Sequence, residues 1–283
     1  IMDDFHSLNA AINAKAGRKL GPSILVSIAI LATVFLTMSY AKFLFAIVAW
    51  IAIGLAAREL TSAYKAGGIA LPVNAILIAL TAILGAAWFG RVSSLAVAMA
   101  ITIPTLLVYI LFKNPKDFVR NSTAAAFAIF YLPFLAGFIL LLANDKDGLA
   151  RIFTLVVLVS CNDTFAYIFG VLFGKHPLAP NISPKKTWEG LIGSIIATTI
   201  GSALVFEFAL EHNWWIGAAI GLVAVITATC GDLIESAVKR DLAIKDMGSI
   251  LPGHGGILDR IDSVLFTGPA VWFALELIKH FKL

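Results

Sequence analysis

The sequence predicts an all-α polytopic membrane protein of about nine transmembrane helices. Of its 283 residues, 60% are hydrophobic and only 13% are charged, whereas soluble domains carry about 25% charged residues. The apolar residues fall in solid runs long enough to cross a bilayer core of about 30 Å. Strands of a membrane β-barrel would instead alternate apolar and polar residues.

Each predicted helix is one of these apolar runs. In chain order the runs cover residues 22–39, 41–57, 69–89, 92–112, 122–143, 149–174, 189–210, 214–238 and 264–281. The second run is short, and its turn with the first is tight. Totals of eight or ten spans are therefore also compatible with the sequence.

Residues 1–21 precede the first run and are expected to form a cytosolic or interfacial segment. Its apolar residues Phe5, Leu8, Ala11 and Ile12 can share one face of a short helix. A cleavable signal peptide starts with a basic segment and then a short apolar stretch. Here acidic residues come first and the first apolar run has full length, so we expect the segment to be retained.

The basic residues predict the orientation in the membrane. If the loops alternate between the two sides, 15 of the 21 Lys and Arg residues lie on the side of the N-terminus and of the loops after spans two, four, six and eight. Cytosolic loops carry the excess of Lys and Arg. The N-terminus is therefore expected in the cytosol and the C-terminus outside.

We expect one integral membrane domain, with five helices in 22–148 and four helices carrying the polar motifs in 149–283. No internal repeat is visible. The basic residues are scattered over five cytosolic segments, which argues against a nucleic-acid partner. Cys161 and Cys230 have neither metal-ligand spacing nor a disulfide framework, and are interpreted as packing residues.

The sixth run contains a polar cluster, with Asn162, Asp163 and Thr164 followed by Tyr167. An ionisable group inside a span costs roughly 2.5–3.5 kcal/mol on insertion scales, so it is a functional candidate. Helical spacing places Asp163 and Tyr167 on one face. For Asn162 and Thr164, an ordinary hydrogen bond between helices is an equal alternative.

A second cluster, SPKKTWEG, occupies residues 183–190 at the start of the seventh run. Lys185 and Lys186 next to the N–H groups of a helix N-terminus suit an anion, with Ser183 beside them. The alternative is that these are topology-determining lysines with an interfacial Trp. This stretch alone does not separate the two interpretations.

The third cluster closes the eighth run and continues to the ninth. Its first part, CGDLIESAVKRD, places polar residues three and four apart on one helical face: Asp232, Glu235, Ser236, Lys239 and Arg240. Asp259 and Asp262 follow at a spacing of three, which suits one hard cation such as Mg²⁺. In the connection between Arg240 and Asp259, Gly255 and Gly256 allow close backbone approach to a ligand, and His254 can donate a hydrogen bond to a phosphate oxygen.

Acids for a metal, bases for phosphates and glycines for close approach predict phosphoryl chemistry on a membrane-embedded substrate. The predicted fold thus includes a polar active site on the cytosolic side of the helices.

These motifs resemble those of the phosphatidate cytidylyltransferase (CDP-diacylglycerol synthase) family. The matching positions in the long gapped signature are Ser236, Lys239, Arg240, Lys245, Asp246, Gly248, Leu251, Pro252, His254, Gly255, Gly256, Asp259, Arg260, Ile261 and Asp262. The stretches 162–167 and 183–190 are also similar to the family. The resemblance covers residues 160–263, whereas the first five runs agree only in hydropathy.

The resemblance implies transfer of cytidylate from CTP to phosphatidate, giving CDP-diacylglycerol and pyrophosphate, with Mg²⁺ in a one- or two-metal site. It also implies a homodimer in the bacterial inner membrane, with the lipid bilayer as its surroundings. The metal ligands would be Asp232 and Asp259, with Asp163, Asp246 and Asp262 as second choices. The proposed catalytic residues are Asp232, Asp259, Lys239, Arg240, His254 and Arg260. The proposed substrate-binding residues are Lys185, Lys186, Ser183, Lys245, Gly255, Gly256, Asn162 and Tyr167.

Two other functions are also considered. A CTP-dependent kinase of a polyprenol or another lipid alcohol shares the metal and nucleotide requirements, but needs a general base for its acceptor. An ion-coupled transporter also carries acids within its spans. Clustering of the polar groups on one side and the lack of an inverted repeat argue against a transporter.

Overall fold

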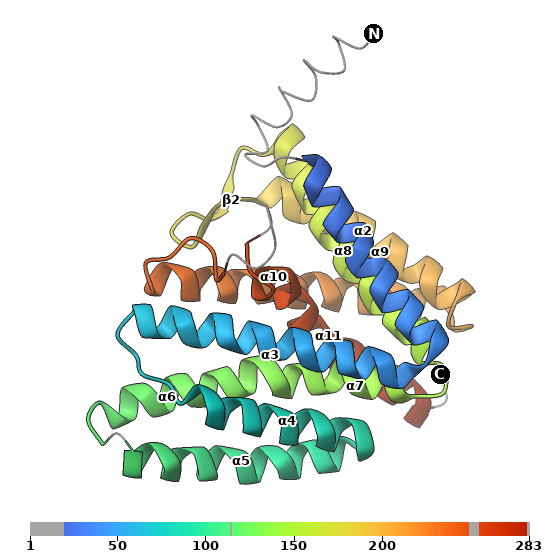
Figure 1. Cartoon of the computed structure of the whole chain (residues 1–283). Coiled ribbons are helices and arrows are strands. Elements are labelled where there is room, and N and C mark those ends of the chain that lie inside the picture. Colours follow the sequence, from blue (N-terminus) through green and yellow to red (C-terminus); the bar gives the residue numbers. More distant parts are fainter. Residues whose placement is uncertain (1–19, 114, 249–254, 282–283) are drawn as a thin grey trace.

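The computed structural model describes residues 20–113, 115–248 and 255–281. In these ranges the chain forms nine apolar helical rods (Figure 1). The helices are α2 (Leu20–Tyr40), α3 (Lys42–Ala66), α4 (Val73–Phe89), α5 (Val92–Lys113), α6 (Phe118–Ile129), η1 (Phe130–Phe134), α7 (Leu135–Asn144), α8 (Gly148–Phe173), α9 (Trp188–Phe208), α10 (Trp214–Asp241) and α11 (Leu258–Phe281). The segments α6, η1 and α7 are contiguous and make one rod.

The predicted fold class is confirmed. By length and composition, seven of the described helices can cross a membrane, and the apolar stretches Ser27–Tyr40 and Val73–Phe89 are shorter. The predicted helix within residues 1–21 lies almost entirely outside the described residues. The division at residue 148 stays a prediction.

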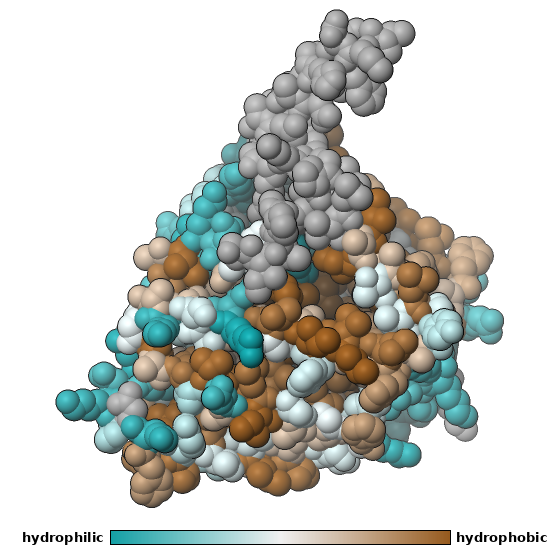
Figure 2. Space-filling model, in the orientation of Figure 1, coloured by the Kyte–Doolittle hydropathy of each residue, from teal (hydrophilic) through white to brown (hydrophobic). Residues whose placement is uncertain are grey.

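Lipid-facing side chains dominate the surface between the two ends of the rods. Ile78, Ile101 and Ile226, each within the middle part of its helix, are 71%, 61% and 63% exposed, which in water would be unfavourable over so large an area. Figure 2 shows hydrophobic residues across the middle of the visible face, with hydrophilic residues at its left and right edges. This distribution is the one expected of helices that cross a bilayer.

The fifth rod contains a π-helical turn, η1, between α6 and α7. Pro133 lies in this turn and has no N–H to donate, so the regular hydrogen-bond ladder cannot continue through it. Such bulges are frequent near functional sites. Here the turn places Tyr131, which is 1% exposed, against Phe266 of α11, with ring centroids 5.8 Å apart.

A small hairpin, β1 (Pro177–Ala179) and β2 (Ser183–Thr187), joins α8 to α9. The two strands are antiparallel, with Pro177 opposite Thr187 and Ala179 opposite Ser183. From sequence, this stretch was predicted only as the approach to a helix. The stretch contains Pro184 and has no alternation of apolar and polar residues that would predict a strand.

The last four helices pack in sequence, α8 on α9, α9 on α10 and α10 on α11. Helix α11 also packs against α7, and α7 packs against α4. The buried core joins both halves of the chain, because Leu60 and Ile83 lie in the same cluster as Leu258 and Leu265. The site described below is therefore supported from both halves.

Opposite ends of the rods carry different polar groups. The hairpin and the connections α3–α4, α5–α6 and α10–α11 lie at the left and upper left in Figure 1, whereas the α7–α8 turn lies at the right. At that right-hand end, buried Arg151 pairs with Asp145 at 3.0 Å, Asp147 at 2.8 Å and Glu276 at 3.7 Å. This cluster ties the α7–α8 turn to α11.

Candidate active site

A polar cavity of about 490 Å³ lies between α8, β2, α9, α10 and α11. Ten of the residues proposed from sequence line it: Asp163, Tyr167, Ser183, Lys185, Lys186, Asp232, Lys239, Asp259, Arg260 and Asp262. They come from three stretches that are separated in the chain. The fold brings these stretches together at the hairpin end of the helices.

Lys239 connects α10 to α11 across the cavity. Its Nζ lies 2.5 Å from Oε2 of Glu235, one turn earlier on α10, and 2.8 Å from Oδ1 of Asp259. Glu235 is 1% exposed, and a buried carboxylate is costly without a partner of opposite charge. Its spacing in the sequence places Glu235 on the polar face of this helix, but Glu235 was not among the predicted site residues.

Asp232 connects α10 to the hairpin. Its Oδ2 lies 2.8 Å from Nζ of Lys186, and its Oδ1 accepts a hydrogen bond of 3.2 Å from Ser236. Both proposed metal ligands, Asp232 and Asp259, are thus paired with a lysine. Each lysine holds its carboxylate at the cavity and is itself a candidate phosphate ligand.

Local hydrogen bonds fix the hairpin at the start of α9. Thr187 is the N-cap of that helix, and its hydroxyl accepts from the N–H of Gly190 at 3.2 Å. His176, before β1, contacts the Glu189 carboxylate at 2.6 Å through Nδ1. A side chain that caps an exposed helix terminus commonly contributes about 1 kcal/mol.

Arg240, which the sequence predicted as a catalytic residue, is not part of the cavity lining. Its Nε donates to the carbonyl of Ile182 in the hairpin loop at 3.1 Å. Consecutive residues of a helix point about 100° apart, and here Lys239 faces the cavity whereas Arg240 faces the hairpin. In this structure Arg240 supports the hairpin.

Helix α8 contributes the acid expected from its polar cluster. Asp163 and Tyr167 both line the cavity, as their spacing of four predicts. Asn162 is 2% exposed and donates from Nδ2 to Oδ1 of Asp163 at 3.0 Å. Asn162 therefore contacts the site through Asp163 and is not part of the lining.

The remaining proposed residues belong to the α10–α11 connection. Lys245 and Asp246 are exposed and, like Gly255 and Gly256, are not part of the lining. Gly255 has φ of 79°, a left-handed conformation that strongly favours glycine. His254 lies outside the described residues.

Sequence reasoning missed Glu59, a carboxylate of α3 that is 5% exposed. It accepts hydrogen bonds from the backbone at the start of α11. Arg58 and Glu59 ended the second apolar run, so the helix was predicted to stop at residue 57, whereas α3 continues to Ala66. The spacing of Glu59 from the buried Ala56 and Ala63 is the signal that could have placed it on an inward face.

Acidic side chains slightly outnumber basic ones in the cavity lining, as expected of a site that binds a metal cation. Among the described residues that line it, five are acids (Asp163, Asp232, Glu235, Asp259 and Asp262) and four are bases (Lys185, Lys186, Lys239 and Arg260). Anionic substrates would add to this negative excess, so a divalent cation fits the donors present. In the described ranges no three His, Cys, Asp or Glu side chains are grouped to hold a metal unaided. Mg²⁺ is often bound by one or two carboxylates together with water and substrate phosphates.

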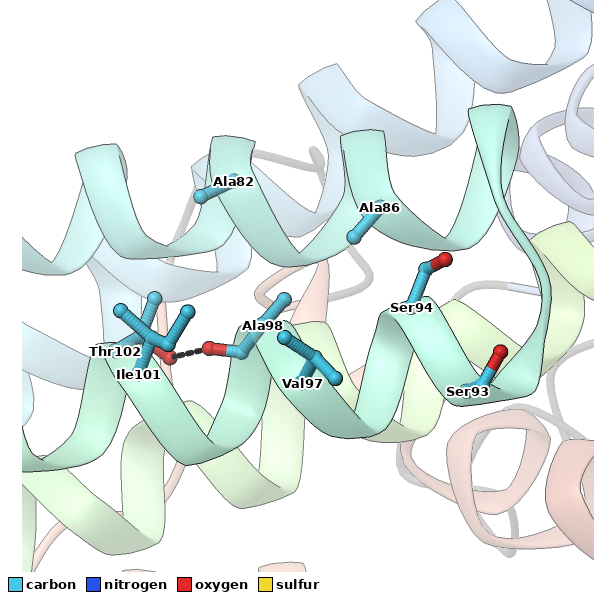
Figure 3. Close-up of a pocket in the computed structure, with 8 residues that line it drawn as sticks. All are labelled: Ala82, Ala86, Ser93, Ser94, Val97, Ala98, Ile101 and Thr102. Atoms are coloured by element: carbon cyan, nitrogen blue, oxygen red, sulfur yellow. Dashed lines mark hydrogen bonds between the residues drawn. The ribbon is translucent and has the colours of Figure 1, made fainter.

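A second cavity, of about 470 Å³, has no charged side chain among the described residues that line it. Figure 3 shows it between α4 and α5, with small and apolar side chains from both helices around it. Its hydroxyl groups are those of Ser93, Ser94 and Thr102, and Thr102 donates to the carbonyl of Ala98 at 2.7 Å. This groove lacks the groups needed for phosphate or metal binding.

The sequence is similar to those of known proteins along most of the chain. The model of the family described as "Cytidylyltransferase family" matches residues 23–278. The chain is 35% identical over 280 residues to the phosphatidate cytidylyltransferase of Mycobacterium leprae, covering 93% of this chain and 90% of the relative. It is 32% identical over 283 residues to that of Mycobacterium bovis, covering 95% and 92%. A phosphatidate cytidylyltransferase of Staphylococcus haemolyticus is 42% identical over 167 residues, covering 58% and 63%.

Proposed function

Because the chain belongs to the cytidylyltransferase family, we propose that it transfers the cytidylyl group of CTP to phosphatidate, giving CDP-diacylglycerol and pyrophosphate. The single observation that carries the proposal is the cavity in which Lys186, Asp232, Lys239 and Asp259 meet at the end of apolar helices. A lipid substrate can keep its acyl chains among such helices while its phosphate reaches the charged groups.

In this reaction a phosphate oxygen of phosphatidate attacks the α-phosphorus of CTP. The new P–O bond forms as the bond between the α-phosphorus and the bridging oxygen to the β-phosphorus breaks, and pyrophosphate leaves. The nucleophile is already anionic, so the chain need not supply a general base or a covalent intermediate. Its task is to align the two substrates and neutralise their charge.

The basic residues of the cavity have distinct positions for this task. Lys185 and Lys186 approach from the hairpin, whereas Lys239 and Arg260 approach from α10 and α11. We assign the hairpin lysines to the triphosphate of CTP. Lys239, which lies between Glu235 and Asp259, would neutralise charge that develops on the reacting phosphates.

A divalent cation, Mg²⁺ in our proposal, would be held by Asp232 and Asp259, with Asp163 or Asp262 as further oxygen donors. It would supply positive charge to the phosphate oxygens of the substrates. The acid excess of the lining supports this assignment. Lys186 and Lys239, which pair with Asp232 and Asp259 in the structure, are the bases that would contact the substrate phosphates beside the cation.

We extend the proposal to the cellular setting. The relatives above are bacterial proteins, and the excess of basic residues at the hairpin end supports a cytosolic orientation of the cavity in the inner membrane. The family resemblance also implies a homodimer.

The experiment uses purified protein in detergent with phosphatidate, Mg²⁺ and CTP labelled either at the α- or at the γ-phosphate. Cytidylyl transfer places the α-label in the lipid extract and releases the γ-label in pyrophosphate. A kinase acting on a lipid alcohol would place the γ-label in the lipid and release CDP. No label in the lipid from phosphatidate would refute the proposal.

A further inference from the structure

Glu59 is a buried acid that the proposed chemistry does not use. It lies on α3, in the first half of the chain and far from the motifs of residues 160–263, and is 5% exposed. Burying an ionised carboxylate costs free energy unless charges or hydrogen-bond donors compensate it. The groups around Glu59 therefore indicate what it does.

Both oxygens of the Glu59 carboxylate accept from the backbone where α11 begins. Oε1 accepts from the N–H of Ile257 and Oε2 from the N–H of Leu258, each at 3.0 Å. Leu258 is the first residue of α11, and the first N–H groups of a helix have no partner within the helix. A negative charge there is also favoured by the helix dipole.

Two glycines of the α10–α11 connection make room for this carboxylate. A Cβ added at Gly256 would lie 2.6 Å from Oε2 of Glu59, and one added at Gly248 would overlap Oε1. At both glycines, the side on which a Cβ would stand therefore faces Glu59 and not a substrate. The close fit makes the Glu59 contact a specific feature of the connection.

Asp259 holds the adjacent part of the same turn. Its Oδ2 accepts from the N–H of Gly256 at 2.7 Å and from that of Met247 at 3.1 Å, while its Oδ1 pairs with Lys239. The consecutive N–H groups of residues 256–258 are thus shared between two carboxylates. Without Glu59, the N–H groups of Ile257 and Leu258 would lose their acceptor. The Asp259 carboxylate could then turn towards them as a replacement acceptor.

We propose that Glu59 is a positioning residue that fixes the N-terminus of α11 and thereby keeps Asp259 and Asp262 directed at the cavity. It does not line the cavity, so it acts through the backbone of residues 256–258. The inference rests on the proposed function, because the position of Asp259 affects turnover only if the cavity carries the reaction.

The test compares Glu59→Gln with Glu276→Gln in the purified full chain. Gln keeps one acceptor oxygen but presents an N–H₂ group to the other backbone donor. Glu276 is the matched control, because it is an acid of α11 paired with Arg151, 17 residues beyond Asp259 or about 26 Å along the helix.

Hydrogen exchange of a peptide covering 255–262 is the first readout. Glu59→Gln should speed the exchange of the amides of Ile257 and Leu258 by about tenfold, as expected when a hydrogen bond to a charged group is lost. Glu276→Gln should leave this peptide at the wild-type rate. This readout needs no enzymatic activity, so it tests the Glu59 contact even if the wild-type protein transfers no cytidylate. Absence of transfer by wild type would refute the proposed function but not the contact.

The second readout is the rate of transfer at increasing Mg²⁺. Glu59→Gln should lower kcat by about tenfold and raise the Mg²⁺ concentration for half-maximal rate several-fold, because a mispositioned carboxylate is a weaker ligand. Wild-type exchange, or wild-type kcat and Mg²⁺ dependence in an active preparation, would overturn the inference.

A glycine pair provides a second route if Glu59→Gln does not fold. Gly256→Ala places a methyl group against Oε2 of Glu59 and should reproduce both effects. Gly54→Ala, on the same helix as Glu59, meets nothing within 4 Å and should change neither readout. Equal behaviour of the two alanine variants would also overturn the inference.

Discussion

Lys186 has two partners in the proposed cycle, Asp232 before substrates bind and a CTP phosphate afterwards. Their ion pair is 2.8 Å long, and the two side chains are only 21% and 35% exposed. Lys186→Ala should therefore raise the KM for CTP by about tenfold, since a charge-assisted contact to phosphate is lost.

Lys175 provides the matched control for that substitution. It belongs to the same connection but is not part of the cavity lining. Lys175→Ala should leave the KM for CTP within about twofold of wild type, the range of an ordinary surface substitution. An unchanged KM in Lys186→Ala would remove this lysine from the nucleotide site.

At the scale of single residues, the sequence predicted side-chain direction where spacing decides it. The pairs Asp163 with Tyr167 and Asp259 with Asp262 reach one cavity because residues three or four apart share a helical face. Glu59 was missed because its partners are backbone N–H groups nearly 200 positions away. No local pattern reports a contact of that kind.

The hairpin is an element whose position depends on α10. Arg240 donates to the Ile182 carbonyl in its loop, whereas Lys239 faces the cavity. Arg240→Gln should therefore raise the KM for CTP about threefold and leave kcat near wild type, because one supporting hydrogen bond is weakened. Lys239→Gln should lower kcat by about tenfold or more, because it removes a charge beside the reacting phosphates.

Steady-state kinetics of the two variants at saturating Mg²⁺ measure this difference. If Arg240→Gln loses as much kcat as Lys239→Gln, Arg240 contacts the reacting groups and the supporting role assigned to it is wrong.

At the scale of elements, the sequence predicted the helices from apolar length but not the hairpin. Strand pairing between Pro177 and Thr187 leaves no periodic signal in so short a segment.

The orientation of the whole molecule follows from its basic residues. Lys116, between α5 and α6, and Lys146, between α7 and α8, are both exposed and lie in connections at opposite ends of the helices. With Cys161 and Cys230 replaced by alanine, Lys146→Cys should react with an impermeant thiol reagent in intact cells. Lys116→Cys should react only after permeabilisation. The reverse pattern would place the cavity outside the cytosol.

The whole fold was predictable in class because lipid imposes helices on every span. The assembly of the site was not, since it depends on α3 of the first half holding α11 of the second. Hydropathy fixes which residues are in the membrane but not which helices are neighbours. The contribution of the first half to the site therefore becomes visible only in three dimensions.

The central claim is that the cavity between α8 and α11 carries metal-dependent cytidylyl transfer, and Asp232→Asn tests it most directly. Asp232 contacts Lys186 and Ser236 through side chains, so a nearly isosteric amide removes its charge with little effect on the backbone. Asp147→Asn, at the opposite end of the molecule beside Arg151, is the control.

The measurement is the rate of label transfer from α-labelled CTP to phosphatidate over a range of Mg²⁺ concentrations, with the thermal stability of each variant recorded. We predict that Asp232→Asn loses activity by about a hundredfold or more at every Mg²⁺ concentration, while its folding and the activity of Asp147→Asn stay near wild type. Near-normal transfer by Asp232→Asn, with ordinary Mg²⁺ dependence, would contradict the assignment of this cavity as the active site.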